Sequence, residues 1–363
     1  MFLALRDLHR SWRRFVLVGT VVALVAVLST VLAGLADGLV RDGTSGLRAL
    51  PYSDLAMQPG SQAVFSRSTL GPRALAAWEG VPGARVSPVG VSFVNAASTT
   101  KAPSIDLALF GVPADSFLVR RPDARAALAG RPGLVLSSEL AKQGVRVGDR
   151  FRVGGSDVAL PVLGFTFAGS YGHVPIAFTS LPAWQSIAFG SDARGRFSAV
   201  ALDLPGHVDA AAVNQRAGTE LKSKRASYDG SPGFTAESLT MTLIRGFLLV
   251  ISGLIVGAFF TVLTVQRTRQ IGLLKAMGAS SGYVIRDGLG QMTLVVLGAT
   301  TVGAAIGVGL ITLLEGGAAP VALQASSVLG SATLLVVAGI VGSMVPFRRI
   351  TKVEPAIALG VEA

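Results

Sequence analysis

Apolar and polar stretches alternate along the chain, and four apolar runs are long enough to cross a bilayer. A transmembrane helix needs about 20 predominantly apolar residues. The four runs that carry no charged residue are 15–36, 246–265, 291–314 and 328–347. We therefore predict four transmembrane helices.

The segment between the first two runs has the pattern of a folded domain instead. Short alternating runs such as SAVALDLPG (198–206) are typical of strands, and the segments 72–83, 138–143 and 209–224 are predicted helices. Val147, Gly148 and Asp149 form a predicted tight turn. At about 200 residues, this segment is large enough to bury its own core. The predicted fold class is a membrane protein with four transmembrane helices and an α+β extracytoplasmic domain inserted between helices 1 and 2.

These patterns divide the chain into nine consecutive segments. In order they are a cytoplasmic N-terminal amphipathic helix (1–14), transmembrane helix 1 (15–39), the α+β domain (40–240), transmembrane helix 2 (241–265), a cytoplasmic loop with a short helix (266–290), transmembrane helix 3 (291–314), a short external loop (315–327), transmembrane helix 4 (328–347) and a cytoplasmic tail (348–363).

Composition agrees with a membrane protein and narrows its chemistry. Of the 363 residues, 50% are hydrophobic and 15% are charged, against about 25% charged in soluble domains. The absence of cysteine excludes disulfides, thiolate metal sites and a cysteine nucleophile. The net charge of +11 comes largely from Lys and Arg beside the apolar runs, which favours contact with a membrane surface over nucleic acid.

The basic residues orient the spans. They cluster before the first run (Arg6, Arg10, Arg13, Arg14), between the second and third (Arg267, Arg269, Lys275, Arg286) and after the fourth (Arg348, Arg349, Lys352). The positive-inside rule then places both termini and the 266–290 loop in the cytoplasm and the 40–240 domain outside, in a multi-pass protein of the cell membrane. A cleaved signal peptide is the alternative for the first run, but its length exceeds the 7–15 apolar residues of such peptides.

No catalytic or metal constellation is visible in the sequence. His173 and His207 lack metal-ligand spacing, and no serine lies in a G-x-S-x-G elbow, so we predict a transport subunit and not an enzyme. No G-x-x-x-x-G-K-[ST] motif is present to bind a nucleotide. Asp37 and Glu315 lie only at the outer ends of the predicted spans, so an ion-driven carrier is disfavoured. If the chain moves a cargo, a separate cytoplasmic protein has to supply the energy.

The stretch QRTRQIGLLKAMGAS (266–280) is the most informative part of the sequence. It predicts a short basic amphipathic helix after the second span, with Ile271, Leu274 and Met277 on one side. Such a helix can dock in a groove of a partner protein. It can equally lie in the lipid headgroups, and the pattern alone does not separate these two interpretations.

This stretch strongly resembles the signature of the FtsX-like permeases, the MacB-type or mechanotransmission (type VII) ABC transporters. The tail TKVEPAIALG (351–360), the segment SSELAKQGVRVGDRF (137–151) and the order of one span, a large domain and three spans are also similar to that family. The resemblance implies a homodimer that binds two copies of a separate cytoplasmic ATPase, which uses the ATP. The loop helix would then be the coupling helix, and an N-terminal helix at about 3–13 would lie along the inner membrane surface. By the match, the ATPase contacts would be Arg267, Arg269, Ile271, Gly272, Leu274, Lys275, Met277 and Gly278.

Within that family the chain resembles the split permeases that lack an ATPase domain, including the HrtB/DevC-like exporters, some of which expel haem. Haem iron accepts Met and Tyr ligands, and carboxylate ligation is chemically possible. Glu237 and Met241 are four residues apart and would share one helix face, and Met57 and Tyr52 could line the same opening. The simpler interpretation is that Met241 packs and that Glu237 caps a helix or is solvated.

We therefore expect a permease subunit of an efflux complex for an amphiphilic cargo, with haem taken laterally from the membrane as the leading candidate. Peptides and lipids are neighbouring cargoes. Two alternatives remain open at this point: a transmitter that activates an extracellular cell-wall hydrolase, and a membrane sensor without an ATPase. No cofactor or metal is expected in the chain itself, and its expected partners are the ATPase, a second copy and membrane lipids.

Overall fold

The computed structural model describes residues 12–99, 104–154, 159–193, 195–206, 208–266, 268–315 and 320–344; of 12–14, 263, 268–270 and 274 it describes only the backbone. The predicted N-terminal helix and the cytoplasmic tail lie outside these residues. The chain divides into two compact units. One, the helical unit, comprises residues 1–39 and 238–363, and the other, the sheet domain, comprises residues 40–237.

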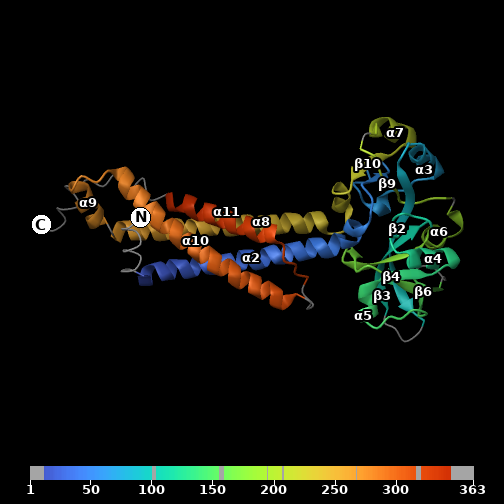
Figure 1. Ribbon diagram of the computed structural model, residues 1–363, viewed down its shortest axis with the longest axis horizontal. Coiled ribbons are helices and arrows are strands. Elements are labelled where there is room, and N and C mark those ends of the chain that lie inside the picture. The colour runs from blue at the N-terminus through green and yellow to red at the C-terminus, as the bar shows by residue number, and fades with distance from the viewer. Residues whose placement is uncertain are drawn as a thin grey trace. The chain divides into compact units, whose positions relative to one another are not determined.

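Four described helices are long and apolar enough to cross a membrane, which confirms the predicted fold class. The first three of them are longer than the charge-free runs because polar residues at their ends continue the helix, whereas the fourth has 20 residues. Only α10 has a described cap at its start, where the Ser280 hydroxyl accepts a hydrogen bond from the backbone N–H of Tyr283. The four helices are α2 (Trp12–Ala49), α8 (Phe234–Gln266), α10 (Ser281–Leu314) and α11 (Ala325–Met344) (Figure 1). The short helix α9 (Thr268–Ala276) lies between α8 and α10 in the chain.

Small residues allow these helices to pack backbone against backbone. A Cβ on Gly257 of α8 would lie 2.8 Å from the carbonyl oxygen of Gly342 of α11, and a Cβ on Gly342 would overlap the backbone of Gly253. On α10, Gly303 lies in the same way against Ala23 of α2. Close approach through small residues is how membrane helices associate, since lipid removes the hydrophobic driving force between them.

The sheet domain contains two arrangements of strands that share one long strand, β2 (Arg85–Ser98). The first half of β2 completes an antiparallel sheet in the order β10-β1-β9-β2, formed by a β-α-β-β-α-β set of elements of the ferredoxin-like type. Its other members are β1 (Asp54–Met57), α3 (Pro72–Glu79), β9 (Ala199–Asp203), α7 (Ala210–Ala217) and β10 (Glu220–Ser223).

The second half of β2 belongs to a closed circuit of strands. The order is β2-β3-β8-β4-β6-β5, and β5 pairs again with β2 through Ala96 and Val153. This circuit, inserted between β2 and β9, has both parallel (β3–β8, β4–β6) and antiparallel pairs. Its elements are β3 (Ile105–Val112), α4 (Pro122–Gly130), β4 (Leu134–Ser137), α5 (Ser138–Lys142), β5 (Arg150–Val153), β6 (Ala159–Thr166), β7 (Ser170–Tyr171), β8 (Val174–Ser180) and α6 (Leu181–Phe189). The described residues of the domain also form the 3₁₀ turns η1 (Phe65–Arg67), η2 (Gly190–Asp192) and η3 (Ala226–Gly230).

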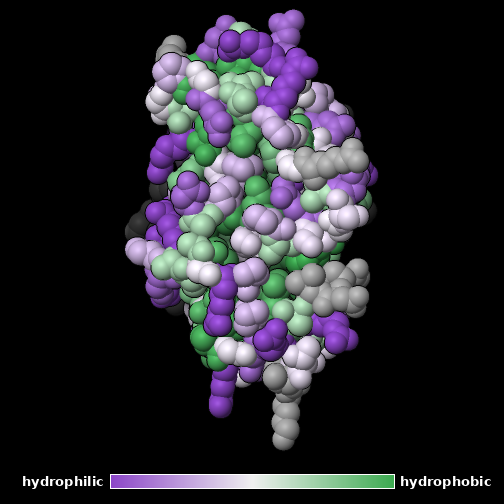
Figure 2. Space-filling model, turned by 90° about the vertical axis from the view of Figure 1, so that its right-hand side faces the viewer, coloured by the Kyte–Doolittle hydropathy of each residue, from purple (hydrophilic) through white to green (hydrophobic). Residues whose placement is uncertain are grey.

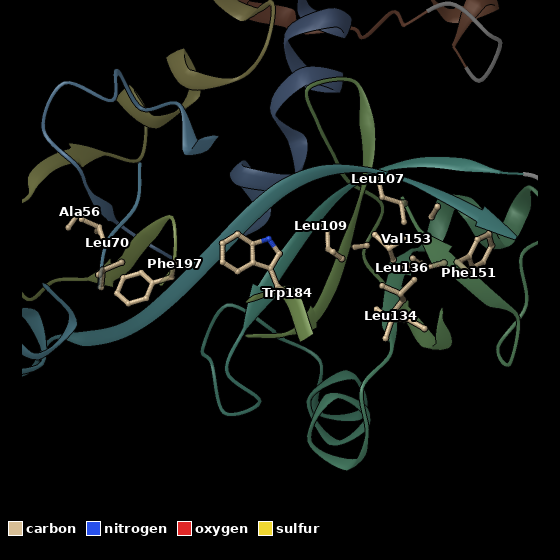
Figure 3. Packing of buried hydrophobic residues seen from close by; sticks show 14 of the residues in the cluster. Ala56, Leu70, Leu107, Leu109, Leu134, Leu136, Phe151, Val153, Trp184 and Phe197 are labelled. Carbon is tan, nitrogen blue, oxygen red and sulfur yellow. The ribbon is translucent and has the colours of Figure 1, made fainter. Parts of the chain in front are cut away.

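Large side chains fill the interior of the sheet domain. Trp184 of α6 is 2% exposed, and in Figure 3 it lies between a group around Phe197 and a group around Leu109. Its ring occupies the space left by Gly90 and Gly111 on β2 and β3, and its indole N–H donates to Ser92 Oγ at 3.1 Å. On the outside of this domain, hydrophilic and hydrophobic residues are interspersed (Figure 2).

One predicted helix is wrong over half its length. The segment 209–224 forms α7 only as far as Ala217, and residues 220–223 form β10. Gly218 ends the helix in the left-handed conformation (φ +65°), which glycine adopts without steric cost. Strand β10 then pairs with β1, so a long-range partner overrides the local helical pattern.

Candidate functional site

The short basic helix predicted between the second and third spans is α9, and local chemistry fixes how it ends. The backbone N–H of Met277 donates to Leu273 and that of Gly278 to Lys275, both at 3.0 Å. Gly278 then has φ +95°, a conformation in which any side chain would be strained. The chain therefore turns sharply at Gly278 before α10 begins at Ser281.

The two sides of this segment differ in exposure. Ile271 is 7% exposed and packs against Val284 and Ile285 of α10, whereas Met277 is 72% exposed and Leu273 45%. Leu273 and Met277 are four residues apart. Leu273 and Met277 are therefore exposed large apolar side chains of this segment, and we call them the outer pair.

The predicted docking face needs correction at this point. We expected Ile271, Leu274 and Met277 on one side, but Ile271 faces α10, whereas Met277 is exposed. The periodicity located the apolar positions without showing which of them the chain itself covers, and Leu273 was missed for that reason. Gly272 is buried and Lys275 is half-buried. Arg267 and the side chains of Arg269 and Leu274 lie outside the described part of the structure.

The predicted cargo residues divide into two pairs. Glu237 and Met241 both lie in α8 at helical spacing, and both are half-buried. Glu237 already has a partner, because its Oε1 lies 3.1 Å from Nε2 of His173. A cargo that uses this carboxylate would share it with the imidazole or displace the imidazole.

Tyr52 and Met57 do not line an opening, contrary to the prediction. Met57, the last residue of β1, is 0% exposed, and Tyr52, two residues before β1, is 4% exposed with its hydroxyl 2.8 Å from Ser227 Oγ. Burial raises the pKa of the Tyr52 phenol. Both side chains belong to the interior of the sheet domain because β1 is a central strand, flanked by β9 and β10.

The helical unit also contains charged residues that the charge-free runs did not reveal. Arg245 lies inside α8, and its Nη2 donates to the carbonyl oxygen of Ala33 of α2 at 3.2 Å. Within the described residues, Arg245 Nε and Asp37 Oδ2 are buried polar atoms without a hydrogen-bond partner. Ionisable groups of membrane helices that face the bundle are commonly functional. With Met241, Arg245 continues the spacing of four that starts at Glu237.

His173, set aside in the sequence for lack of metal-ligand spacing, joins two distant carboxylates. Its Nδ1 lies 2.9 Å from Oδ2 of Asp42, and its Nε2 contacts Glu237. No group of three His, Cys, Asp or Glu residues within the described chain is arranged to hold a metal ion. The cluster is therefore an arrangement of hydrogen bonds, and nothing in the sequence pattern pointed to it.

Comparison with known proteins finds similarity to permeases. Residues 242–355 match the model of the FtsX-like permease C-terminal family. Over 363 residues the chain is 22% identical to HrtB of Staphylococcus haemolyticus, a permease protein assigned to a hemin transport system, with 99% of each chain covered. Over 127 residues it is 27% identical to the macrolide export ATP-binding/permease protein MacB of Wolinella succinogenes, covering 34% of this chain and 20% of that protein. The solved extracellular domain of the noncanonical ABC-type transporter YknZ from Gram-positive bacteria aligns with 47% of this chain and 98% of its own, at a TM-score of 0.33 and 15% identity.

Proposed function

Because the chain carries an FtsX-like permease domain and is homologous to HrtB and to MacB-type ABC permeases, we propose that it is the permease subunit of an efflux complex driven by a separate cytoplasmic ATPase. The observation that carries this proposal is the outer pair. It lies inside the matched region, beside a turn that glycine alone favours, and between two candidate spans. An exposed apolar pair on a short helix is the kind of anchor that fits a groove in a partner protein.

The basic flanks place this segment in the cytoplasm and the sheet domain outside. Two copies of the chain would bind two ATPase subunits. ATP binding would bring the ATPases together, and α9, held to α10 through Ile271, would pass the movement to α8 and α10. A rigid contact is needed for this, and the buried Ile271–Val284 packing supplies one.

The cargo proposed is an amphiphilic molecule taken from the membrane, with haem as the leading candidate. Along α8, Glu237, Met241 and Arg245 offer a carboxylate, a thioether and a guanidinium at successive turns. Carboxylate and thioether can ligate haem iron, and a guanidinium pairs with a propionate. Support for haem comes from the likeness to HrtB and from this donor set.

The docking part of the proposal is tested by placing a charge on the outer pair. Leu273→Asp and Met277→Asp should each weaken co-purification with the genomically adjacent ATPase roughly tenfold or more, since an interface anchor is lost and a charge is buried. Val147→Asp is the matched control, because Val147 is an apolar residue, 61% exposed, in the sheet domain. If the two α9 variants bind the ATPase like the control, the segment is not the docking site, and a membrane sensor without an ATPase becomes the better description.

The cargo part is tested by titrating haemin into the reconstituted complex and following ATP hydrolysis. Met241→Leu keeps an apolar side chain of similar size but removes the sulfur, so haemin stimulation should fall severalfold while basal hydrolysis persists. Stimulation that survives in Met241→Leu would remove the thioether from the site. A complex that hydrolyses ATP but ignores haemin would direct the search to peptides, to lipids or to activation of an extracellular hydrolase.

A further inference from the structure

A two-residue turn at the tip of a hairpin presents His173 to two helices. Strands β7 and β8 pair through Tyr171 and Val174, and Gly172 and His173 form the turn between them. Both turn residues have positive φ, +60° and +65°. Two consecutive left-handed residues make a type I′ turn, in which Gly, Asn and Asp are the favoured residues. A histidine in this position carries conformational strain that the surrounding structure has to offset.

The turn is fixed in place against the C-terminal part of α2. The backbone N–H of Gly172 donates to the carbonyl oxygen of Gly43 at 3.0 Å, and the Ser231 hydroxyl donates to the same oxygen at 2.7 Å. The Ser170 hydroxyl donates to Asp42 Oδ1 at 3.1 Å. These contacts hold the turn, and with it the backbone of His173, beside α2.

From this position the ring reaches carboxylates on two different helices. Nδ1 meets Asp42 of α2, and Nε2 meets Glu237 of α8. A neutral imidazole has one N–H and one lone pair, whereas an imidazolium has two N–H groups. Two ionised carboxylates, which only accept, can both be satisfied only by the imidazolium. Loss of the proton leaves one carboxylate facing a nitrogen lone pair.

The two carboxylates lie where the chain passes between its two units. The divisions fall between Leu39 and Val40 and between Glu237 and Ser238. Asp42 comes three residues after the first division, and Glu237 is the last residue before the second. The ring therefore joins the only two segments through which the chain connects the units, at their ends within the sheet domain.

We propose that protonated His173 is a positioning residue that clasps α2 and α8 together at these two points, and that loss of its proton releases one of the helices. The clasp itself follows from the geometry of the sheet domain. That it regulates coupling between ATP hydrolysis and cargo movement rests on the proposed function.

The surroundings of the ring raise the pKa of His173 above the ordinary value for histidine. Burial of the ring opposes the charged form, but the hydrogen bond to Asp42 and the negative charges of Glu237 and Asp42 outweigh it and raise the pKa of His173. These two carboxylates, one from each helix, are the charged groups that act on the ring; Tyr171 of the same hairpin instead donates to the Gly230 carbonyl oxygen. A raised pKa means that the clasp is complete below about pH 6.5, the usual value for histidine, and is lost as the pH rises through the raised value.

The chain contains no cysteine, so spin labels can be attached at chosen sites without removing native residues. Arg41 and Ala236 are exposed neighbours of the two carboxylates. In the full-length chain with Arg41→Cys and Ala236→Cys, pulsed electron paramagnetic resonance should give a narrow distance distribution at about pH 5 and a broad one at about pH 9. The midpoint should lie above about 6.5.

Two variants separate a proton switch from a purely structural histidine. Asp42→Asn can donate its amide N–H to the Nδ1 lone pair of neutral His173, while Nε2–H donates to Glu237, so the distribution should stay narrow at about pH 9. His173→Asn tolerates the left-handed turn but is too short to bridge both helices, so its distribution should be broad at both pH values.

A native distribution that does not change with pH, or a His173→Asn chain that stays narrow, would overturn the clasp. The regulatory part is read separately from haemin-stimulated ATP hydrolysis across the same pH range. If the distances switch but hydrolysis does not follow them, the clasp stands and its regulatory role falls. Failure of the native chain to bind the ATPase would count against the proposed function and leave the distance result intact.

Discussion

The two units of this chain obtain close packing in different ways. In the sheet domain, large side chains fill the space, with Trp78, Trp184, Phe110 and Phe178 among the fully buried residues. In the helical unit, small apolar clusters such as the one around Val256 are accompanied by close backbone contacts at Gly253, Gly257, Gly303 and Gly342. Water drives large apolar side chains inward in one environment, whereas helices in lipid associate largely through van der Waals packing, which close approach of the backbones strengthens.

Glycine has a role in both units, but its neighbour differs. Gly90 and Gly111 leave room for Trp184, a buried side chain. Gly342 leaves room for the backbone of Gly253, which cannot move without separating two helices. Substitution of Gly342 and of a glycine beside Trp184 therefore disturbs different kinds of neighbour.

The largest effect should come from removing volume in the sheet domain. Trp184→Ala empties the space between the two groups in Figure 3 and should cost about 3–5 kcal/mol. Hydrogen exchange by mass spectrometry on the full chain should show exchange in β2 and β3 roughly a hundred- to several-thousand-fold faster. Trp184→Phe keeps a ring against Gly90 and Gly111 and should lose much less. Equal protection in the alanine variant and the native chain would contradict the role given to this side chain.

A smaller effect should come from adding a single methyl group in the helical unit. Gly342→Ala would press a Cβ into the backbone of Gly253, and overpacking of this kind costs about 1–3 kcal/mol. Gly330→Ala, on the same helix, meets nothing within 4 Å and should be neutral or slightly stabilising, because alanine is the better helix former. Thermal unfolding of both variants in one detergent gives the comparison. Identical melting temperatures would show that α8 and α11 do not depend on this contact.

The smallest effect should come from a polar atom inside the sheet domain. Tyr52→Phe removes one buried hydroxyl, while Ser227 keeps its hydrogen bond to the Lys224 carbonyl oxygen, so the loss should be about 0.5–1.5 kcal/mol. Chemical unfolding followed by fluorescence measures it. Haemin-stimulated ATP hydrolysis should not change, since Tyr52 is buried; a loss of stimulation without a loss of stability would return Tyr52 to the cargo site.

The candidate site was predictable only where the evidence is local. The motif at 266–280 gave the position of α9 and its family resemblance, because the residues concerned are adjacent in the chain. Which side of α9 is buried depends on the contact of Ile271 with Val284 and Ile285, which lie near the start of the next helix, α10. Arg245 was missed because the charge-free run begins one residue after it, although α8 continues through it.

By itself, the sequence determined the four spans, the inserted α+β domain and the short basic helix. Each of these follows from the length and the periodicity of apolar residues within one continuous stretch of the chain. Only the tertiary structure decided that 220–223 are a strand, that Met57 and Tyr52 are buried, and that His173 joins Asp42 to Glu237. Asp42 is 131 positions from His173, and Glu237 is 64 positions from it. The physical reason is that burial and hydrogen bonding depend on which distant segments of the chain pack together. A local pattern of polar and apolar residues does not show which distant segment a given stretch will contact.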